Sequence, residues 1–140
     1  VGQQGVVYAV DVQQNMLDML SARAADYQLH NIEVIKGDAE KMNGLAIAEG
    51  CVDLVLFIVS LHQMKDKQTA LKEAARMLAD DGSLMIIEWG TRLGCPYPLA
   101  QQMCFDPQDI TNEIKNAGLR VVDTFYLKPY YWGMELGKVE

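Results

Sequence analysis

The sequence predicts an α/β protein with a mostly parallel sheet and helices on both faces. Strand-like and helix-like segments alternate along the chain, an order typical of layered α/β folds. Residues 51–58 are apolar at almost every position, which favours a strand covered on both faces. Residues 119–127 and 131–139 both read as strands, and the short link between them predicts a closing antiparallel hairpin.

The first half of the chain contains three predicted strands and one helix. β-Branched and aromatic residues predict a strand over 5–12, and a short strand over 32–36 ends at Gly37. The helix between them covers 14–29, because apolar residues recur there at steps of three and four. These residues are Leu17, Leu20, Ala24 and Tyr27. The third strand is the apolar segment 51–58.

The second half continues the alternation. A helix is predicted over 67–79, a turn at Asp80-Asp81-Gly82, and another apolar strand over 83–89. Asp106-Pro107 has the composition of an N-cap followed by a proline in the first helical turn. The helix that follows should end at Gly118, since glycine readily takes the left-handed conformation of a C-cap.

Composition excludes several functional classes. Half of the 140 residues are apolar and 22% are charged, which excludes a disordered chain. The longest apolar stretch, 54–61, is far shorter than the ~20 residues of a membrane span, so no membrane partner is expected. A net charge of −7 disfavours a nucleic-acid partner, because phosphate backbones are bound through clustered cations.

The cysteines and the first residues bear on localisation. Cys51, Cys95 and Cys104 are odd in number and lack C-x-x-C spacing, which argues against a disulfide framework and a metal site. Residues 1–5 have neither the basic nor the apolar region of a signal peptide. Together these features favour a cytoplasmic protein.

Carboxylates follow three of the predicted strands. Asp11, Asp38 and Glu88 stand at or just beyond strand carboxyl ends, the place where α/β sheets bind ligands. One carboxylate can accept both hydroxyls of a ribose, and a second can accept from an exocyclic amine such as that of adenine. The pattern therefore predicts a nucleoside pocket. The alternative is that each is simply a polar residue where a strand reaches the surface.

The chain resembles class I S-adenosylmethionine-dependent methyltransferases over essentially all 140 residues. The resemblance is carried by motifs at successive strands, whose order and spacing match the family: Val7-Tyr8-Ala9-Val10-Asp11-Val12 with Met16-Leu17, Gly37-Asp38-Ala39-Glu40, Val52-Asp53-Leu54-Val55-Leu56 with Leu61-His62, and 78–88. It implies a Rossmann-like fold closed by the C-terminal hairpin and S-adenosyl-L-methionine as the cofactor.

The resemblance also implies roles for individual residues. Asp11 would hold the ribose hydroxyls, and Asp38 would accept from the adenine amino group, with the backbone N–H of Ala39 facing a ring nitrogen. The remaining predicted cofactor contacts are apolar: Val12, Met16, Phe57 and Ile58.

Three further residues are implied on the side of the methyl acceptor. His62 is the predicted catalytic residue, a general base, and Glu88 and Trp89 are predicted to face the substrate. The alternative for His62 is a packing or helix-capping histidine. The second histidine of the family's motif is Gln63 here.

The largest departure from the family concerns its first strand and Gly-rich loop, which would lie upstream of Val1. We therefore expect residues 1–140 to form a single, N-terminally incomplete methyltransferase-like domain. That first strand would lie between the strands predicted near 6–12 and 52–58. Otherwise these two strands pair directly, or another copy of the chain covers their edges, so a complete chain would be a homo-oligomer.

The sequence thus predicts a methyltransferase acting on a small molecule. Two alternatives stay open. One is a non-catalytic remnant of the same fold that serves as an oligomeric or protein-binding module. The other is an NAD-binding domain, which Asp11 at a second-strand end suits equally well.

Overall fold

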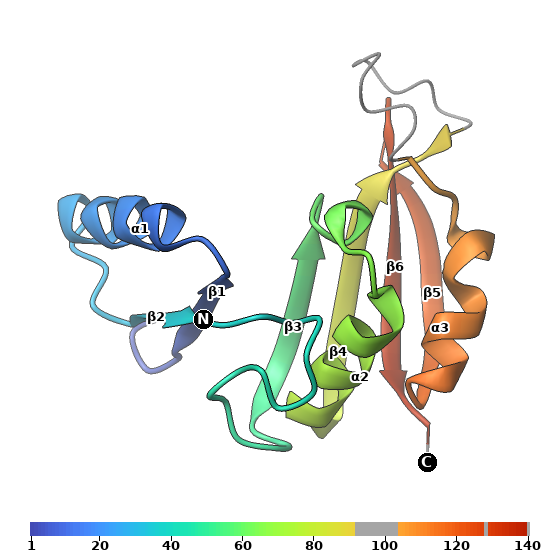
Figure 1. Ribbon diagram of the computed structural model, residues 1–140, viewed down its shortest axis with the longest axis horizontal. Helices are drawn as coiled ribbons and strands as arrows, with labels where there is room; N and C mark the ends of the chain where they lie inside the picture. The colour runs from blue at the N-terminus through green and yellow to red at the C-terminus, as the bar shows by residue number, and fades with distance from the viewer. Residues whose placement is uncertain (92–103, 128, 140) are drawn as a thin grey trace.

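A computed structural model describes residues 1–91, 104–127 and 129–139, and it confirms the α/β class. The strands form a two-stranded sheet and a four-stranded sheet that lie side by side (Figure 1). The elements follow in the predicted order: β1 (Val7–Asp11), α1 (Gln14–Asp26), β2 (Ile32–Lys36), β3 (Val52–Ile58), the 3-10 turn η1 (Leu61–Gln63), α2 (Lys67–Met77), β4 (Leu78–Trp89), the 3-10 turn η4 (Pro107–Ile110), α3 (Thr111–Asn116), β5 (Leu119–Leu127) and β6 (Tyr131–Lys138).

The first unit of the fold is β1–α1–β2. β1 and β2 pair in parallel, from Val7 opposite Ile32 to Asp11 opposite Lys36. α1 connects the two strands and buries only Leu17 and Ala24 among its residues. The helix ends at Asp26, earlier than its apolar spacing predicts. Tyr27, at the C-cap, and the three residues after it are exposed.

The second unit is the four-stranded sheet, in the order β3-β4-β6-β5. β3 pairs in parallel with β4, whereas β6 lies antiparallel to both β4 and β5. The closing hairpin of β5 and β6 is therefore confirmed. Across both sheets, parallel and antiparallel pairings are equal in number, so the sheet structure is mixed.

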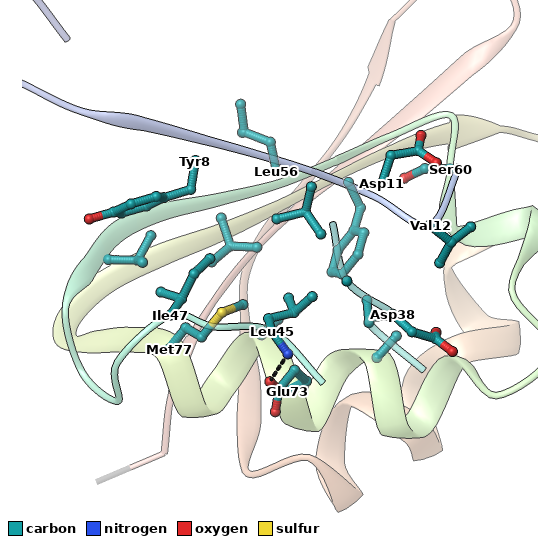
Figure 2. A pocket seen from close by; sticks show the side chains of 18 of the residues that line it. Tyr8, Asp11, Val12, Asp38, Leu45, Ile47, Leu56, Ser60, Glu73 and Met77 are labelled. Carbon is teal, nitrogen blue, oxygen red and sulfur yellow. Dashed lines mark hydrogen bonds between the residues drawn. The ribbon is translucent and has the colours of Figure 1, made fainter. Parts of the chain in front are cut away.

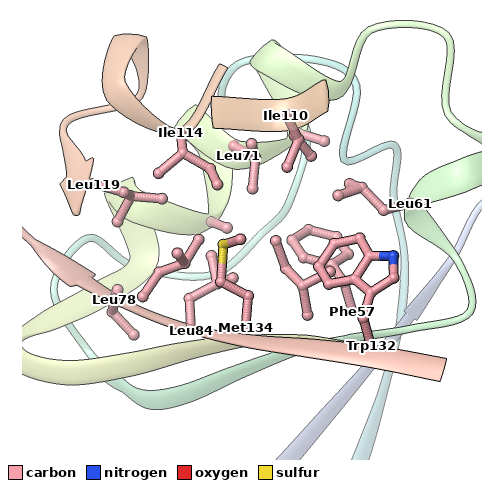
Figure 3. Close-up of a cluster of buried hydrophobic side chains, with 14 residues drawn as sticks. Phe57, Leu61, Leu71, Leu78, Leu84, Ile110, Ile114, Leu119, Trp132 and Met134 are labelled. Atoms are coloured by element: carbon pink, nitrogen blue, oxygen red, sulfur yellow. The ribbon is translucent and has the colours of Figure 1, made fainter. Parts of the chain in front are cut away.

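Helices α2 and α3 lie on one face of the four-stranded sheet and bury the main core against it (Figures 1 and 3). Trp132 is fully buried and donates its indole N–H to the backbone carbonyl of Phe105 at 2.7 Å. The buried members of this core are Phe57, Leu61, Ala70, Leu71, Ala74, Leu78, Leu84, Ile86, Ile110, Ile114, Leu119, Trp132, Met134 and Leu136.

The prediction that the strand of residues 51–58 is covered on both faces is wrong. Phe57 is buried, but Leu54, Leu56 and Ile58 remain 48%, 50% and 54% exposed. Side chains alternate between the faces of a strand, and α2 and α3 cover the same face of this sheet. The opposite face of β3 is therefore open.

Three local predictions, one of them wrong and two confirmed, concern turns and helix caps. The expected turn at 80–82 lies within β4, where the pairing with β3 jumps from Leu78 to Ser83. Asp106 forms the expected N-cap as part of a capping box, although the first turn after it is 3-10 rather than α-helical. Gly118 takes a φ of 73°, as a left-handed cap requires.

A small second cluster connects the two units. Leu45, Ile47 and Met77 are buried together, and side chains from both strands of the two-stranded sheet, Val10 and Ile35, pack against them. Within the described residues β1 and β3 are not hydrogen-bonded to each other, so direct pairing of these strands, one of the three expected arrangements, is not observed. No helix in the described part of the chain is long and apolar enough to cross a membrane.

Candidate functional site

A cavity of about 540 Å³ lies between the two sheets, with β1 forming one wall and β3 the other (Figure 2). Its volume is within the ~300–1,000 Å³ range of small-molecule sites. At one end the walls are apolar, where Tyr8, Ile47 and Met77 lie. At the other end Asp11, Asp38 and Ser60 add polar groups, at the carboxyl ends of the strands.

Asp11 and Asp38 reach this cavity because β1 and β2 are parallel and in register. Asp11 ends β1 opposite Lys36, and Asp38 follows two residues after Lys36. The two carboxylates therefore stand on neighbouring strand ends and line the same cavity. The structure therefore places these two carboxylates side by side at one edge of the sheet, as the sequence predicts.

The hydrogen bonds of these carboxylates leave acceptor capacity toward the cavity. The Asp11 carboxylate accepts the backbone N–H of Gln13 at its Oδ1 (2.8 Å) and has no other hydrogen-bond partner among the described residues. Asp38 accepts the backbone N–H of Glu40 (3.0 Å) and forms an exposed ion pair with Lys41 (3.2 Å). Each carboxylate oxygen accepts up to two hydrogen bonds, so both side chains can bind further donors.

Backbone geometry adds a donor beside Asp38. The N–H of Ala39, which lines the cavity, has no hydrogen-bond partner within the residues that the structure describes. The loop is tight here, since at Gly44 a Cβ atom would collide with the carbonyl oxygens of Asp38 and Lys41. Glycine at this position therefore allows the close approach that shapes the loop.

Two glutamates fix this loop to α2, and neither role was predicted from the sequence. Glu40 accepts the backbone N–H groups of Lys65 and Asp66, both at 2.7 Å, just before α2 begins. Glu73 on α2 is fully buried and accepts the N–H groups of Asn43 and Leu45 at 2.9 and 3.3 Å. These bonds connect residues 25 to 30 positions apart, so no local pattern in the sequence reveals them.

Glu73 is kept ionised by its neighbour on the same helix. The Arg76 guanidinium donates two hydrogen bonds to the Glu73 carboxylate, at 2.8 and 2.9 Å. These bonds hold the pKa of Glu73 below its ordinary value, although burial of the group acts in the opposite direction. A buried carboxylate can therefore anchor the loop without losing its charge.

The end of β3 has a strained residue. Val59 has a φ of 50°, in the left-handed region that β-branched residues rarely enter. Its N–H bonds the carbonyl of Ile87 at 2.8 Å, which extends the pairing of β3 with β4 by one residue. The turn then directs Ser60 to the cavity and begins η1, which carries His62. Such strain is common at functional sites.

His62 does not line the cavity but packs on the end of β4. Its ring lies 5.1 Å from the ring of Trp89, centroid to centroid, and its Nδ1 is 2.9 Å from Oε2 of Glu88. Glu88 is fully buried, so contact between Glu88 and a substrate would run through His62. The three residues predicted on the acceptor side are thus brought together.

The predicted cofactor residues fall into two groups. Neither Met16 nor Ile58 lines the cavity: Met16 is on the first turn of α1 and 44% exposed, and Ile58 points to the open face of β3. Three residues that the sequence analysis did not select, Gln13, Glu40 and Gln63, do line it. The predicted residues that line the cavity are Asp11, Val12, Asp38, Ala39 and Phe57.

A family model described as a methyltransferase domain matches residues 2–86. The chain belongs to this methyltransferase family. Demethylmenaquinone methyltransferase from Oceanobacillus iheyensis is 32% identical over 88 residues, which cover 63% of this chain and 36% of that protein. The chain thus spans little more than a third of the length of this curated relative.

Solved structures support the fold. An S-adenosylmethionine-dependent methyltransferase from Aquifex aeolicus matches with a TM-score of 0.86 and 24% identity, over 97% of this chain and 70% of that one. The cyclase SpnF matches with a TM-score of 0.79 and 15% identity, over 97% of this chain and 67% of its own. At these identities the likeness establishes a shared fold alone, and a fold shared with a cyclase does not fix the reaction.

Proposed function

We propose that the chain binds S-adenosyl-L-methionine at the polar end of the cavity between β1 and β3, where Asp11 and Asp38 follow the strand carboxyl ends, and transfers its methyl group to a small molecule. The supporting observation is the placement of Asp11 and Asp38 on adjacent strand ends beside the same cavity. The relatives named demethylmenaquinone methyltransferase support a small-molecule acceptor.

The residues present fit the adenosyl group. Asp11 offers acceptor positions suited to the two ribose hydroxyls, and Asp38 offers one to the adenine amine. The N–H of Ala39 supplies a donor for a ring nitrogen. Phe57 and Val12 add apolar contacts from either side of the cavity.

The bound cofactor supplies an activated methyl group on a sulfonium, and the protein supplies mainly position. In-line transfer depends on holding donor and acceptor in one orientation, which accounts for several kcal/mol of a barrier. The two glutamates that fix the loop of residues 38–45 to α2 serve this purpose, because they hold Asp38 and Ala39 in place.

Isothermal titration with S-adenosylhomocysteine tests the proposal. Asp11→Ala removes charge-assisted hydrogen bonds worth ~1.5–3 kcal/mol, so we expect about 10- to 150-fold weaker binding. Asp18→Ala is the matched control, since Asp18 lies on α1 outside the cavity and its side chain, within the described residues, accepts a hydrogen bond from Gln14 alone. Equal affinities of both variants and the unaltered chain would refute the assignment of Asp11.

A second candidate, a non-catalytic module, is supported by the uncovered strand edges. Within the described part of the chain no strand pairs with β1 or β3 on the sides that face the cavity. Such edges are templates for association with another chain. Absence of S-adenosylhomocysteine binding at millimolar concentration would favour this module, and binding of NADH instead would favour a dinucleotide site.

A further inference from the structure

The four-stranded sheet has one face that no helix of the described chain covers, on the side away from α2 and α3 (Figure 1). Directly paired residues on neighbouring strands point to the same side of a sheet. The paired residues on this side form two rows, and we call them the open face: Leu56, Met85, Glu135 and Asp123 in one row, and Ile58, Ile87, Gly133 and Phe125 in the next. At Gly133 a Cβ atom would collide with the Phe125 ring, which therefore lies over this position. The open face is thus mainly apolar, and Leu56 and Ile58 are half exposed.

Two carboxylates lie on the open face. Glu135 on β6 and Asp123 on β5 are paired directly across the two strands. Glu135 accepts the hydroxyl of Ser83 at 2.8 Å, and Asp123 accepts the backbone N–H of Thr124 at 2.8 Å. Neither carboxylate forms an ion pair within residues 1–91, 104–127 and 129–139, although Arg120 lies on the same face. Like charges directly opposite each other are destabilising, so this pair favours a cation from outside the sheet.

Helix α1 exposes a second apolar surface. It packs on β1 and β2, apart from the four-stranded sheet (Figure 1), and most of its side chains reach solvent. Residues three or four positions apart are neighbours along one side of a helix. On the outer side of α1 such neighbours form a stripe that we call the α1 ridge: Met16, Met19, Arg23 and Tyr27. The three apolar members are 44%, 66% and 71% exposed, and Arg23 forms no ion pair with any described residue.

The α1 ridge and the open face are complementary in size, polarity and charge. A helix of 13 residues is ~20 Å long, close to the ~23 Å of a seven-residue strand such as β3. Methionine side chains adapt to irregular apolar surfaces. Arg23, in the middle of the ridge, would bring a guanidinium to Asp123 and Glu135, a pairing that suits its planar donors. The acidic residues of the helix, Asp18 and Asp26, lie on the neighbouring row rather than in the ridge.

We propose that two copies of the chain form a dimer in which the α1 ridge of each lies on the open face of the other. Because Leu17 and Ala24 hold α1 on its own β1 and β2, the outer ridge faces other molecules. The reciprocal contact is self-complementary, as a closed two-fold dimer requires. It joins side chains of a sheet face, so it differs from association through the backbone edges of β1 and β3. The inference goes beyond the proposed function and does not depend on cofactor binding.

Sedimentation equilibrium of the unaltered chain and of two single variants tests the apolar contact. Ile58→Gln on the open face and Met19→Gln on the ridge each remove an apolar group from the interface. We therefore expect the dissociation constant of the dimer to rise about 10- to 100-fold in either variant. Ile58 lies outside the cavity and both side chains are exposed in a single copy, so neither change should prevent folding. Met42→Gln is the matched control, since Met42 is 49% exposed but belongs to neither surface.

An exchange of charges tests how the two surfaces meet. Arg23→Glu and Asp123→Lys should each weaken the dimer about tenfold, because each places like charges together across the interface. The double variant restores an opposite-charge pair, so its dissociation constant should return to within about three-fold of the value for the unaltered chain. Lys115→Glu, an exposed position on α3 outside both surfaces, should dimerise like the unaltered chain.

Each other outcome overturns the inference. A chain that stays monomeric at millimolar concentration has no such interface, and a dimer that Ile58→Gln and Arg23→Glu leave unchanged is held by another surface, such as the strand edges. Oligomers larger than a dimer contradict the two-fold arrangement, and a double variant as weak as the single ones contradicts the charge pairing. Circular dichroism checks that each variant folds, and if Ile58→Gln does not, the exchange of charges decides alone. Titration with S-adenosylhomocysteine tests the proposed function separately.

Discussion

The two parallel strand pairs of this protein have the same backbone pairing but very different burial. β1 and β2 contain no fully buried residue, and α1 buries only Leu17 and Ala24. β3 and β4 belong to a sheet whose core has fourteen buried residues under two helices. An isolated two-stranded sheet is at best marginally stable. Parallel pairing alone therefore does not stabilise the first unit, and its stability depends on the cluster at Leu45, Ile47 and Met77.

Both units contribute residues to the candidate cofactor site. Asp11 and Asp38 come from the weakly buried unit, whereas Phe57 and Ser60 come from the well-buried one. Elements that bind ligands are often the less stable part of a fold. A ligand in the cavity would contact both and so hold them together.

The largest expected effect comes from the core of the four-stranded sheet. Trp132→Ala removes a fully buried indole and its hydrogen bond to Phe105, so we expect the free energy of unfolding to fall by about 3–5 kcal/mol. Urea unfolding measures this loss. Hydrogen exchange should show reduced protection across both units, since the first unit depends on the second.

Leu17→Ala is the matched substitution in the first unit. It should cost about 2–3 kcal/mol locally and reduce protection chiefly in residues 7–36. Equal loss of protection in both units for both variants would mean that the chain unfolds as one cooperative body and that its two units do not differ in stability.

A smaller effect is expected where the two units are joined. Glu73→Gln replaces the carboxylate that accepts hydrogen bonds from Arg76, and it leaves only one acceptor oxygen for the N–H groups of Asn43 and Leu45. We therefore expect the free energy of unfolding to fall by about 2 kcal/mol at neutral pH. The pKa of Glu73 in the folded state lies below its ordinary value of 4.5. Its stabilising effect is therefore complete above that value and is lost as the pH falls through the folded pKa.

Urea unfolding of the unaltered chain and of Glu73→Gln, at pH about 7 and pH about 3, checks both statements. The difference between the two proteins should shrink at the lower pH. Glu33→Gln, an exposed glutamate on β2, should behave as the unaltered chain. A difference that grows on acidification would contradict the pKa assignment.

The smallest expected effect concerns the strained residue after β3. Val59→Gly relieves a left-handed backbone conformation that costs a β-branched residue ~1–2 kcal/mol, but it increases the entropy of the unfolded chain. We therefore expect a change within about 1 kcal/mol in either direction. Val55→Gly, in the regular part of β3, should cost clearly more. Equal losses in urea would show that Val59 is not strained.

Several features of the site were predictable from local sequence. Asp11 and Asp38 follow recognisable strands, and in a parallel pair the ends of neighbouring strands meet at the same edge. Other features were not predictable. Glu73 looks like an ordinary helical glutamate, and its backbone partners are 28 to 30 residues away. The side-chain direction of Ile58, a predicted cofactor contact, was not predictable either, because only the packing of α2 and α3 decides which face of β3 stays open.

The sequence by itself determined the order of strands and helices, the closing hairpin and the carboxylates at two neighbouring strand ends. These follow from hydrophobic periodicity, turn residues and capping, which act over a few positions. Only the tertiary structure decided that the strands divide into two sheets, which face of β3 stays open, and that Glu88 meets His62 across 26 positions. Those outcomes depend on which surfaces pack together, and packing is set by the whole chain rather than by any one segment.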